Sequence, residues 1–481
     1  MPKDVVLGLD LGTSGVRVLA VDFDGNIVAE SNESYPLLTP KPGWTEQRPS
    51  DWLAASLRAL RDIVDGLEPN SIKALGLSGQ MHGMVALDKS RNVIRPAILW
   101  NDQRTQKAIE EIDKVIPKKE MIAKTGNPAI TGFQLSKIIW LRQNEPENYS
   151  KLAHVLLPKD YLAFALTGEM NSEATDASGT NIFNIKTKTW DDDIAEALGL
   201  EQSIFPNIVN SHEISGHLSK EMALKSNLPK GLAVIAGAGD NAAAATGLGL
   251  GSKNLTRGAL SLGTSGVIFA PLESPTPDPK GRVHLFCHAD ASYNLLGVTL
   301  SAAGSYEWFQ KTFAGNYSFA QLDNLAATSQ IGSNGVTFKP YLAGERSPYL
   351  DPNLRASFSG LSLANTLADM TRSVLEGVAF SLRDTLEVIT KLTTVNEFLL
   401  TGGGSKSELW RQILADVLQR KLLLPKFNQG AAYGAALLAL QGSGVVVQAS
   451  TAAQVEIAKV IVPKDSSTYE PSYEKYKSLN F

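Results

Sequence analysis

The hexapeptide LGTSGV decides the fold, because it occurs twice in the chain, at residues 11–16 and again at residues 262–267. Each copy follows an apolar segment, LGLD at residues 7–10 and GALS at residues 258–261, and a second apolar segment comes directly after each. This pattern predicts a strand, a tight turn at Gly-Thr-Ser-Gly and a second strand. A whole supersecondary unit that recurs so far along a chain predicts two lobes of related fold.

The two copies differ at one chemically important position, since Asp10 in the first copy is replaced by Ser261 in the second. A glycine-rich turn after a buried strand presents consecutive backbone N–H groups, which bind phosphate, and its hydroxyls add donors. A carboxylate beside phosphates can hold Mg²⁺ directly or through water, and one metal ion needs one such carboxylate. We therefore expect the two turns to clamp one polyphosphate and Asp10 to hold its Mg²⁺; two ordinary hairpin turns are the alternative. The expected phosphate contacts are Thr13, Ser14, Gly263 and Thr264.

The composition excludes several classes of function. The chain has 481 residues, of which 43% are hydrophobic and 20% charged, which is ordinary for a globular protein with more than one core. Its net charge of −4 offers no basic surface for nucleic acid. Cys287 is its one cysteine, so neither an intramolecular disulfide nor a multi-cysteine zinc site can form, and we expect a cytoplasmic protein. Because no apolar run reaches about 18 residues, we expect no membrane span.

Apolar periodicity predicts a mixture of strands and helices, and hence the α/β class. The chain opens with three strands in an antiparallel meander, at residues 5–12, 16–22 and 27–35. An amphipathic helix is predicted at residues 50–66, with Ser50 as its N-cap. Further predicted elements are a buried strand at residues 72–80, helices at residues 134–143, 320–329, 364–390 and 406–419, and a buried helix packed through small residues at 430–442.

We place the boundary between the lobes after residue 246, which gives an N-terminal domain at residues 1–246 and a C-terminal domain at residues 247–481. No long linker rich in Pro or Ser separates these halves, so we expect the lobes to touch and a cleft between them to bind the ligand.

Other familiar signatures are absent: the sequence contains neither a P-loop nor a strict Gly-x-Gly-x-x-Gly after a strand, and neither His-Glu-x-x-His nor Gly-x-Ser-x-Gly.

Asp240 is the candidate general base. It follows the apolar strand LAVIAG within GAGDNAAAATG, and Asn241 comes directly after it. A carboxylate at a strand end can accept the proton of a substrate hydroxyl during phosphoryl transfer, and the ordinary pKa of Asp, about 3.9, would leave it ionised at neutral pH. The alternative is that Asp240 only caps the alanine-rich helix that follows.

Three further segments place polar residues or glycines at strand ends. SGQMHG at residues 78–83 carries Met81 and His82, which suit a polyol, or else form a turn whose histidine bonds to backbone. WNDQR at residues 100–104 could line a sugar site or close a loop with a surface salt bridge. The glycines at residues 402–404 lead from a strand into a helix, and would let a nucleoside lie against backbone or form a plain connection.

Together these segments resemble the FGGY family of carbohydrate kinases over nearly the whole chain, and within it the members that act on the ketopentose xylulose. SGQMHG and WNDQR are the more specific matches, since other sugar kinases of the family tend to differ there. Gln134 in GFQLSKIIWL stands where Pro, Ser or Thr is usual, and Ser407 stands where some relatives carry Asn. The matching segments are GLDLGTSGV (8–16), GWTEQRPSDW (43–52), SGQMHG (78–83), RPAILWNDQR (95–104), LLPKDYL (156–162), GAGDNAAAATG (237–247), LSLGTSGV (260–267), YLAGERSPYLDP (341–352), RSVLEGVAF (372–380) and GGGSKSELWRQILAD (402–416).

The resemblance implies a two-lobed α/β fold of the actin and hexokinase (ribonuclease H-like) ATPases, with a duplicated core and an inter-lobe cleft. It implies ATP-dependent phosphorylation of a ketopentose with Mg²⁺, D-xylulose first, with D-ribulose or another polyol as the nearer alternative. A nucleotide-dependent binding protein of the actin or chaperone class is the more distant alternative, and the oligomeric state is left open, with a homodimer as one option. The implied roles are Asp240 as base, Met81, His82 and Asn241 beside the sugar, Asp10 near the metal, Thr13 and Thr264 in the phosphate turns, and Gly403 and Ser407 beside adenosine.

Overall fold

The computed structural model describes residues 3–427, 429–444, 455–464 and 466–479, and the chain forms two compact units. Neither unit is continuous in sequence, because a helix near the C-terminus packs on the sheet of the first unit. The domain boundary after residue 246 remains a prediction. Unit 1 consists of Met1–Gly251, Phe286–Tyr293 and Gln429–Gln454, and unit 2 of Ser252–Leu285, Asn294–Asn428 and Val455–Phe481.

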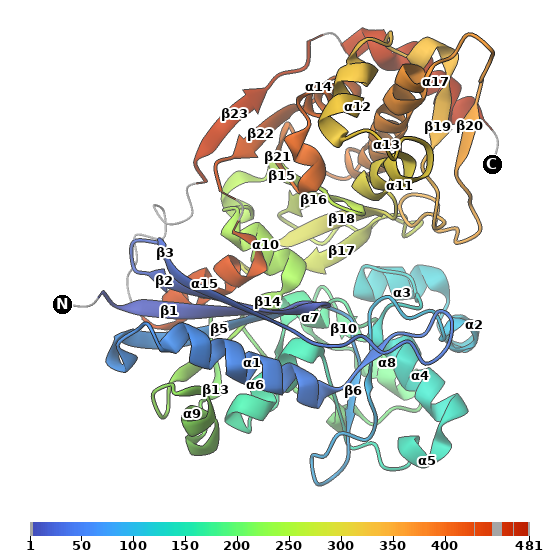
Figure 1. Cartoon of the computed structure of the whole chain (residues 1–481). Helices are drawn as coiled ribbons and strands as arrows, with labels where there is room; N and C mark the ends of the chain where they lie inside the picture. Colours follow the sequence, from blue (N-terminus) through green and yellow to red (C-terminus); the bar gives the residue numbers. More distant parts are fainter. Residues whose placement is uncertain (1–2, 428, 445–454, 465, 480–481) are drawn as a thin grey trace. The chain divides into compact units, whose positions relative to one another are not determined.

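A six-stranded mixed sheet forms the centre of unit 1, in the order β13-β14-β5-β1-β2-β3 (Figure 1). The predicted meander is confirmed, because β1 pairs antiparallel with β2, and β2 with β3. On the other side β5 runs parallel to β1, and β14 parallel to β5, so the C-terminal ends of these three strands meet at one edge of the sheet. The strands are β1 (Val5–Leu11), β2 (Gly15–Asp22), β3 (Ile27–Ser34), β5 (Ile72–Gly79), β13 (Ile214–His217) and β14 (Ala233–Gly239).

Side chains of β1 alternate between two cores, as the period of a strand requires. The odd-numbered residues of Val5–Leu11 belong to the core that includes α1 (Pro49–Val64) and α6 (Pro158–Thr167). Val6 belongs instead to the core of α15 (Gly430–Gly442). Figure 1 shows α1 and α6 on one face of the sheet, and α15 with α10 (Asp240–Gly247) on the other. By the same alternation, Asp10 faces the side of α15 and α10.

Helix α15 lies so close to the sheet and to α10 that glycines are required at the contacts. A Cβ on Gly8 would be 2.0 Å from the carbonyl oxygen of Ala432, and a Cβ on Gly434 would be 1.7 Å from that of Ala243. No side chain fits at such distances, so the backbones of these elements touch directly. The prediction of a buried helix at residues 430–442 that packs through its small residues is therefore confirmed.

The rest of unit 1 forms a second apolar core around α4 (Gln134–Asn144), with short strand pairs beside it. Its strands are β4 (Glu46–Gln47), β6 (Val85–Leu87), β7 (Ala97–Ile98), β8 (His154–Leu156), β9 (Asn171–Glu173), β10 (Phe183–Asn184), β11 (Thr189–Trp190) and β12 (Asn207–Val209). The remaining helices of unit 1 are α2 (Gln106–Val115), α3 (Lys118–Thr125), α5 (Pro146–Tyr149), α7 (Ala174–Ala177), α8 (Asp192–Ala197) and α9 (Lys220–Ser226), of which α9 packs against α1 in the first core.

The sheet of unit 2 repeats the plan of the sheet of unit 1, in the order β17-β18-β16-β15-β21-β22-β23. Strand β15 pairs antiparallel with β16 and parallel with β21, as β1 does with β2 and β5. Beyond them β22 is parallel to β21 and β23 antiparallel to β22, as β14 and β13 are in unit 1. The repeated turn therefore belongs to a repeated sheet. The strands of unit 2 are β15 (Arg257–Leu262), β16 (Gly266–Leu272), β17 (His284–Cys287), β18 (Tyr293–Thr299), β19 (Thr337–Lys339), β20 (Ser357–Ser359), β21 (Glu397–Thr401), β22 (Lys421–Pro425) and β23 (Ile457–Ile461); the end of β17 and the first residue of β18 belong to the segment Phe286–Tyr293 of unit 1.

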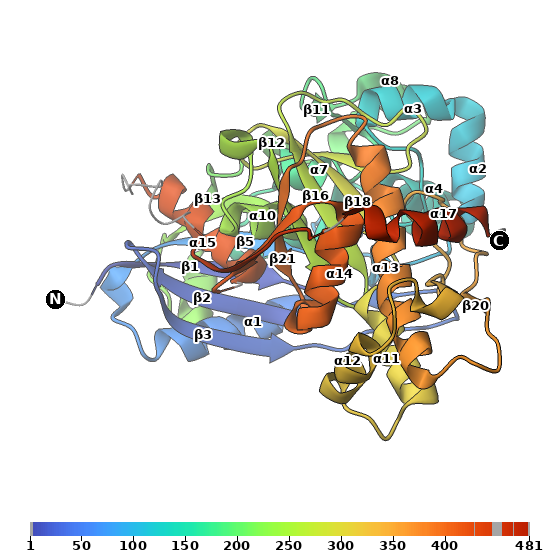
Figure 2. The ribbon, with the colours of Figure 1, turned by 90° about the horizontal axis from the view of Figure 1, so that it is seen from above.

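Helices α13 and α14 of unit 2 lie side by side, with α12 packed against α13 (Figure 2). The predicted helices at residues 134–143, 320–329, 364–390 and 406–419 are confirmed, to within a few residues, by α4, α12, α13 and α14. In the part of the chain that the structure describes, no helix is long and apolar enough to cross a membrane. The helices of unit 2 are α11 (Ala303–Phe313), α12 (Phe319–Ala327), α13 (Leu367–Ile389), α14 (Glu408–Leu418) and α17 (Glu470–Ser478).

The predicted helix at residues 50–66 is present as α1, but Ser50 as its N-cap was wrong. Helix α1 begins at Pro49, Arg48 occupies the N-cap position, and no side chain caps the helix by a hydrogen bond. Proline favours the first helical position because its φ is already helical and it has no N–H to satisfy. The serine therefore falls inside the first turn.

Candidate active site

The first Gly-Thr-Ser-Gly turn joins β1 to β2 and is held by side chains from elsewhere in unit 1. The N–H of Gly12 donates to the carbonyl oxygen of Gly15 at 3.0 Å. The buried hydroxyl of Tyr35 lies within hydrogen-bonding distance of the carbonyl oxygens of both glycines, and Gln47 donates to the carbonyl oxygen of Thr13 at 2.7 Å. These contacts fix the shape of the turn, which a preorganised anion site requires.

Thr13 connects this turn to two of the segments singled out in the sequence. The indole N–H of Trp100, in WNDQR, donates to the hydroxyl oxygen of Thr13 at 3.0 Å. The Thr13 hydroxyl in turn donates to Oε1 of Gln80, in SGQMHG, at 3.4 Å, while the neighbouring Ser14 is exposed. Three segments that are far apart in the sequence therefore meet at one hydroxyl group, a contact that the sequence did not predict.

Two carboxylates interact at the edge of the unit 1 sheet, Asp10 near the end of β1 and Asp240 at the start of α10. Burial raises the pKa of Asp10 to about 6, and its Oδ1 has no hydrogen-bond partner among the described residues. Burial, and then the charge of Asp10, raise the pKa of Asp240 to about 7. An ordinary pKa was expected for Asp240, but burial and the charge of Asp10 raise it into the range where a general base is most effective.

Asp240 does not cap α10, which was the alternative for this residue. Gly239 occupies the N-cap position, and no side-chain hydrogen bond caps the helix. The Oδ1 atom of Asp240 instead accepts the backbone N–H of Asn241 at 2.7 Å and its side-chain amide at 3.0 Å. The same amide reaches the sulfur of Met81 at 3.8 Å. Three of the predicted substrate residues, Met81, Asp240 and Asn241, therefore lie together.

His82, the fourth predicted substrate residue, has an unusual backbone conformation. Its φ is +69°, a value that non-glycine residues seldom adopt. The ring Nδ1 lies 2.7 Å from the carbonyl oxygen of Gly179, so the histidine does bond to backbone, as the alternative for this segment had it. The ring also stacks on Phe133 with centroids 4.3 Å apart.

Two side chains of helix α4 hold the backbone of the SGQMHG segment by hydrogen bonds. Lys137 is fully buried, and its Nζ donates to the carbonyl oxygens of His82 and Gly132, each at 2.7 Å. Burial holds the pKa of this lysine well below its usual range. The amide of Gln134 donates to the carbonyl oxygen of Gly83 at 3.1 Å. Gln134, the departure from the family pattern, therefore supports the same turn, and the signal for Lys137 was a lysine directly before the apolar run IIWL at residues 138–141.

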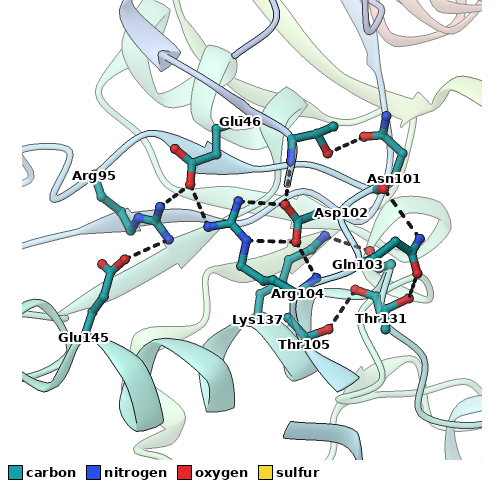
Figure 3. A network of polar contacts seen from close by, with 12 residues as sticks. Glu46, Arg95, Asn101, Asp102, Gln103, Arg104, Thr105, Thr131, Lys137 and Glu145 are labelled. Carbon is teal, nitrogen blue, oxygen red and sulfur yellow. Dashed lines mark hydrogen bonds and ion pairs between the residues drawn. The ribbon is translucent and has the colours of Figure 1, made fainter. Parts of the chain in front are cut away.

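WNDQR ends in a buried ion network rather than the surface salt bridge that we considered (Figure 3). Arg104 donates to both oxygens of Asp102, at 2.8 and 2.7 Å, and to Glu46 at 2.6 Å. The side chains of Arg104 and Asp102 are 0% exposed, and the guanidinium lies 3.8 Å from the ring centroid of Trp44. Glu46 also binds Arg95. These charges are paired inside the protein, so they fix the loop beside the first turn.

Unit 2 contains a cavity of about 590 Å³, a volume within the range of small-molecule sites. The second Gly-Thr-Ser-Gly turn forms part of its wall and is tied to the start of α11, since the carbonyl oxygen of Thr264 accepts the N–H of Ala302 at 2.8 Å. Aromatic side chains of Tyr306, Phe319 and Trp410 line another part of the wall. All four residues predicted to contact ATP from this lobe line the same cavity, namely Gly263, Thr264, Gly403 and Ser407.

Asp323 is a polar residue of this cavity that the sequence did not reveal. It accepts a hydrogen bond from the hydroxyl of Tyr306 at 2.9 Å, and burial raises its pKa. Ser407 is the N-cap of α14, where its hydroxyl oxygen accepts the N–H of Trp410 at 3.1 Å. No local pattern marks Asp323, because it lies on one face of an ordinary helix.

Comparison with known proteins identifies the family. Residues 5–247 match the N-terminal domain, and residues 258–442 the C-terminal domain, of the FGGY family of carbohydrate kinases. A xylulose kinase from Bacillus subtilis (strain 168) is 38% identical over 483 residues, which cover 98% of this chain and 96% of that protein.

Two solved structures are similar over nearly their full length. One is described as a xyloylose kinase from Brucella ovis, with a TM-score of 0.92 at 37% identity, covering 98% of both chains. The other is a gluconate kinase from Lactobacillus acidophilus, with a TM-score of 0.94 at 27% identity, covering 99% of this chain and 97% of that one. The fold is thus the two-lobed actin/hexokinase-like α/β fold. The chain belongs to the FGGY family of carbohydrate kinases and is an ATP-dependent sugar kinase.

Proposed function

We propose that this kinase transfers the γ-phosphoryl group of ATP to D-xylulose, giving D-xylulose 5-phosphate and ADP. The observation that carries the proposal is the meeting of Asp240, Asn241 and Met81 at a sheet edge where burial, and then the charge of Asp10, raise the pKa of the base. The similarity to proteins named as xylulose kinases supports the choice of sugar.

In the proposed reaction, Asp240 accepts the proton of the terminal hydroxyl as that oxygen bonds to the γ-phosphorus and the bond to ADP breaks. Its pKa of about 7 makes the carboxylate a better proton acceptor than an ordinary Asp while leaving much of it ionised at neutral pH. Asn241 holds Oδ1 through two donated hydrogen bonds, so the carboxylate is oriented before the sugar binds. His82 and Met81 provide the neighbouring sugar contacts.

The nucleotide would be shared between the two turns and the cavity of unit 2. Thr13 and Ser14 on the first turn, and Gly263 and Thr264 on the second, would contact the phosphates through backbone N–H groups and hydroxyls. The base and ribose would lie against the aromatic wall of the cavity, near Gly403 and Ser407. In this proposal the base belongs to unit 1 and the nucleoside cavity to unit 2.

The Mg²⁺ that accompanies ATP would lie beside Asp10. Its Oδ1 is buried and has no hydrogen-bond partner within the described ranges, which suits contact with a cation or its water. The described residues contain no group of three or more His, Cys, Asp or Glu side chains that could hold a metal ion, so the other ligands would be phosphate oxygens and water. When bound, the ion would offset negative charge on the phosphates.

The nearer alternative is the same chemistry on another substrate, such as D-ribulose or another polyol. Gluconate is included because one structural neighbour is described as a gluconate kinase. The test is ADP release from Mg-ATP by the purified protein with D-xylulose, D-ribulose, gluconate, simple polyols and a blank without sugar. A response largely confined to D-xylulose is expected, and a stronger response to another sugar would make that sugar the proposed substrate instead.

We also propose the cytoplasm as the place of reaction, because the single cysteine is a buried free thiol.

A further inference from the structure

A chain of hydrogen bonds runs from the backbone of Gly239, next to Asp240, to the buried carboxylate of Glu173. Glu173 has no role in the proposed reaction. The backbone N–H of Gly239, directly before Asp240, donates to the hydroxyl oxygen of Thr175 at 2.9 Å. The same hydroxyl donates to Oε1 of Glu173 at 2.8 Å. Thr175 is 1% and Glu173 0% exposed, so bulk water does not compete for these bonds.

Glu173 is held in one orientation, because both of its oxygens accept hydrogen bonds. Oε1 accepts the N–H of Asp176 at 3.1 Å as well as the Thr175 hydroxyl. Oε2 accepts the N–H of Thr175 at 2.8 Å and the hydroxyl of Ser211 at 2.9 Å. The carboxylate cannot rotate without losing several charge-assisted bonds, and the direction of the Thr175 hydroxyl is fixed with it.

Lys159 balances part of the negative charge of this buried cluster. Its Nζ lies 2.6 Å from Asp160, 3.6 Å from Glu173 and 3.7 Å from Asp176. All of these side chains are almost completely buried. A buried carboxylate needs such a partner, and Lys159 supplies one to Glu173.

Gly239 is the point at which this chain of bonds can act on the base. It is the N-cap residue of α10, and the side chain of Met81 lies so close that a Cβ on Gly239 would be 2.8 Å from its Cγ. A shift of the Gly239 backbone would therefore move the carboxylate of Asp240 and the contact with Met81 together.

We propose that Thr175 is a positioning residue for the reaction, oriented by Glu173: its hydroxyl holds the Gly239 backbone so that Asp240 meets the sugar hydroxyl in the geometry that proton transfer requires. The inference rests on the proposed function, because it takes Asp240 to be the base. A misplacement of about 1 Å can lower a rate by about 10²-fold, so a small movement of this backbone would be enough to affect turnover.

The test compares Thr175→Val, which keeps the shape but loses both bonds, with Thr175→Ser, which keeps the hydroxyl. We expect the valine variant to lower kcat by about tenfold or more, with the KM values for sugar and Mg-ATP little changed, and the serine variant to restore most of kcat. The matched control is Thr125→Val on α3. Thr125 is 0% exposed, and its hydroxyl donates to the carbonyl oxygen of Met121 at 2.9 Å.

Hydrogen–deuterium exchange supplies a readout that does not depend on turnover. Loss of the bond to Thr175 should raise exchange in the peptide that contains Gly239, in the valine variant and not in the control. A valine variant with wild-type kcat and unchanged exchange would overturn the inference. So would equal losses of kcat in Thr175→Val and Thr125→Val that follow equal losses in Tm, because these would reflect stability alone.

Asp240→Asn, assayed in parallel, separates the two proposals. If that variant keeps near wild-type turnover, Asp240 is not the base and the proposed mechanism fails together with the role of Thr175 in it. If Asp240→Asn is inactive while Thr175→Val is normal in kcat and exchange, only the positioning role fails.

Discussion

Replacing Asp240 with Asn should remove catalysis and stabilise the fold at the same time. Asn has nearly the same shape as Asp, but its side-chain oxygen does not accept a proton at neutral pH. A positioned general base contributes about 10²–10⁴-fold to a rate, so kcat should fall by about that factor. The KM for the sugar should change little, because the amide oxygen can still accept the N–H of Asn241.

The stability gain follows from the pKa of Asp240. Burial and the charge of Asp10 raise this pKa from 3.8 to about 7, and one pKa unit corresponds to about 1.4 kcal/mol, so ionising Asp240 costs the folded state on the order of 4 kcal/mol. Because the folded state has the higher pKa, the cost is absent below pH 3.8, grows as the pH rises, and is complete above about pH 7. Asn carries no charge, so the variant should gain more Tm at pH 8 than at pH 5.

Two measurements check this reasoning separately. A coupled assay of ADP release gives kcat, and thermal melting at both pH values gives the change in stability. Near wild-type turnover would refute the role of Asp240 as base. A variant that melts below the wild type at pH 8 would refute the account of burial, even if turnover is lost. In the wild type, kcat/KM should fall as the pH drops through about 7, because protonation removes the acceptor.

Three further substitutions test other parts of the molecule. Asp10→Ala should raise the Mg²⁺ concentration needed for half-maximal rate more than the KM for the sugar, and an unchanged metal requirement would count against its role. Gly434→Ala should lower the free energy of unfolding in urea by about 1–3 kcal/mol or more, because its Cβ would lie 1.7 Å from the carbonyl oxygen of Ala243; unchanged stability would contradict this backbone contact. Asp323→Asn should raise the KM for ATP about tenfold at unchanged sugar KM, because Asp323 lines the proposed nucleoside cavity and its charge-assisted hydrogen bond from Tyr306, another residue of the wall, becomes a neutral one; an unchanged KM for ATP would remove Asp323 from the nucleoside site.

Much of the fold could be predicted from the sequence because strands, turns and helices depend on local patterns. The repeated LGTSGV marks the centre of both sheets, where β1 and β15 each lie between an antiparallel and a parallel neighbour. Candidate residues that follow strand ends also come together, as Met81 and Asp240 do, because β5 and β14 are parallel and end at one edge of the sheet. The Ser50 cap failed where two local preferences competed and Pro49 took the first helical position.

The residues that hold the site in shape could not be predicted in this way. Thr175 acts on Gly239, Lys137 on the carbonyl oxygen of His82, and Trp100 on Thr13, each across a long stretch of chain. Such contacts are decided by tertiary packing, and no local period records them. The pKa of Asp240 was missed for the same reason, since it depends on burial and on a second carboxylate from another strand.

Asp10 and Ser261 occupy equivalent positions before the two turns, and their difference follows from the different part that each turn has in the proposed reaction. In unit 1, burial and then the charge of Asp10 raise the pKa of Asp240, so in the proposal Asp10 serves the base as well as the metal ion. In unit 2, Ser261 is the penultimate residue of β15, beside the cavity lined by Gly263 and Thr264. Two unit charges about 4 Å apart near a protein surface interact by about 4 kcal/mol, so a carboxylate at position 261, with neither a metal ion nor a base beside it, would only repel the polyphosphate. A duplicated fold can therefore bind phosphate with both turns while only one of them keeps a carboxylate.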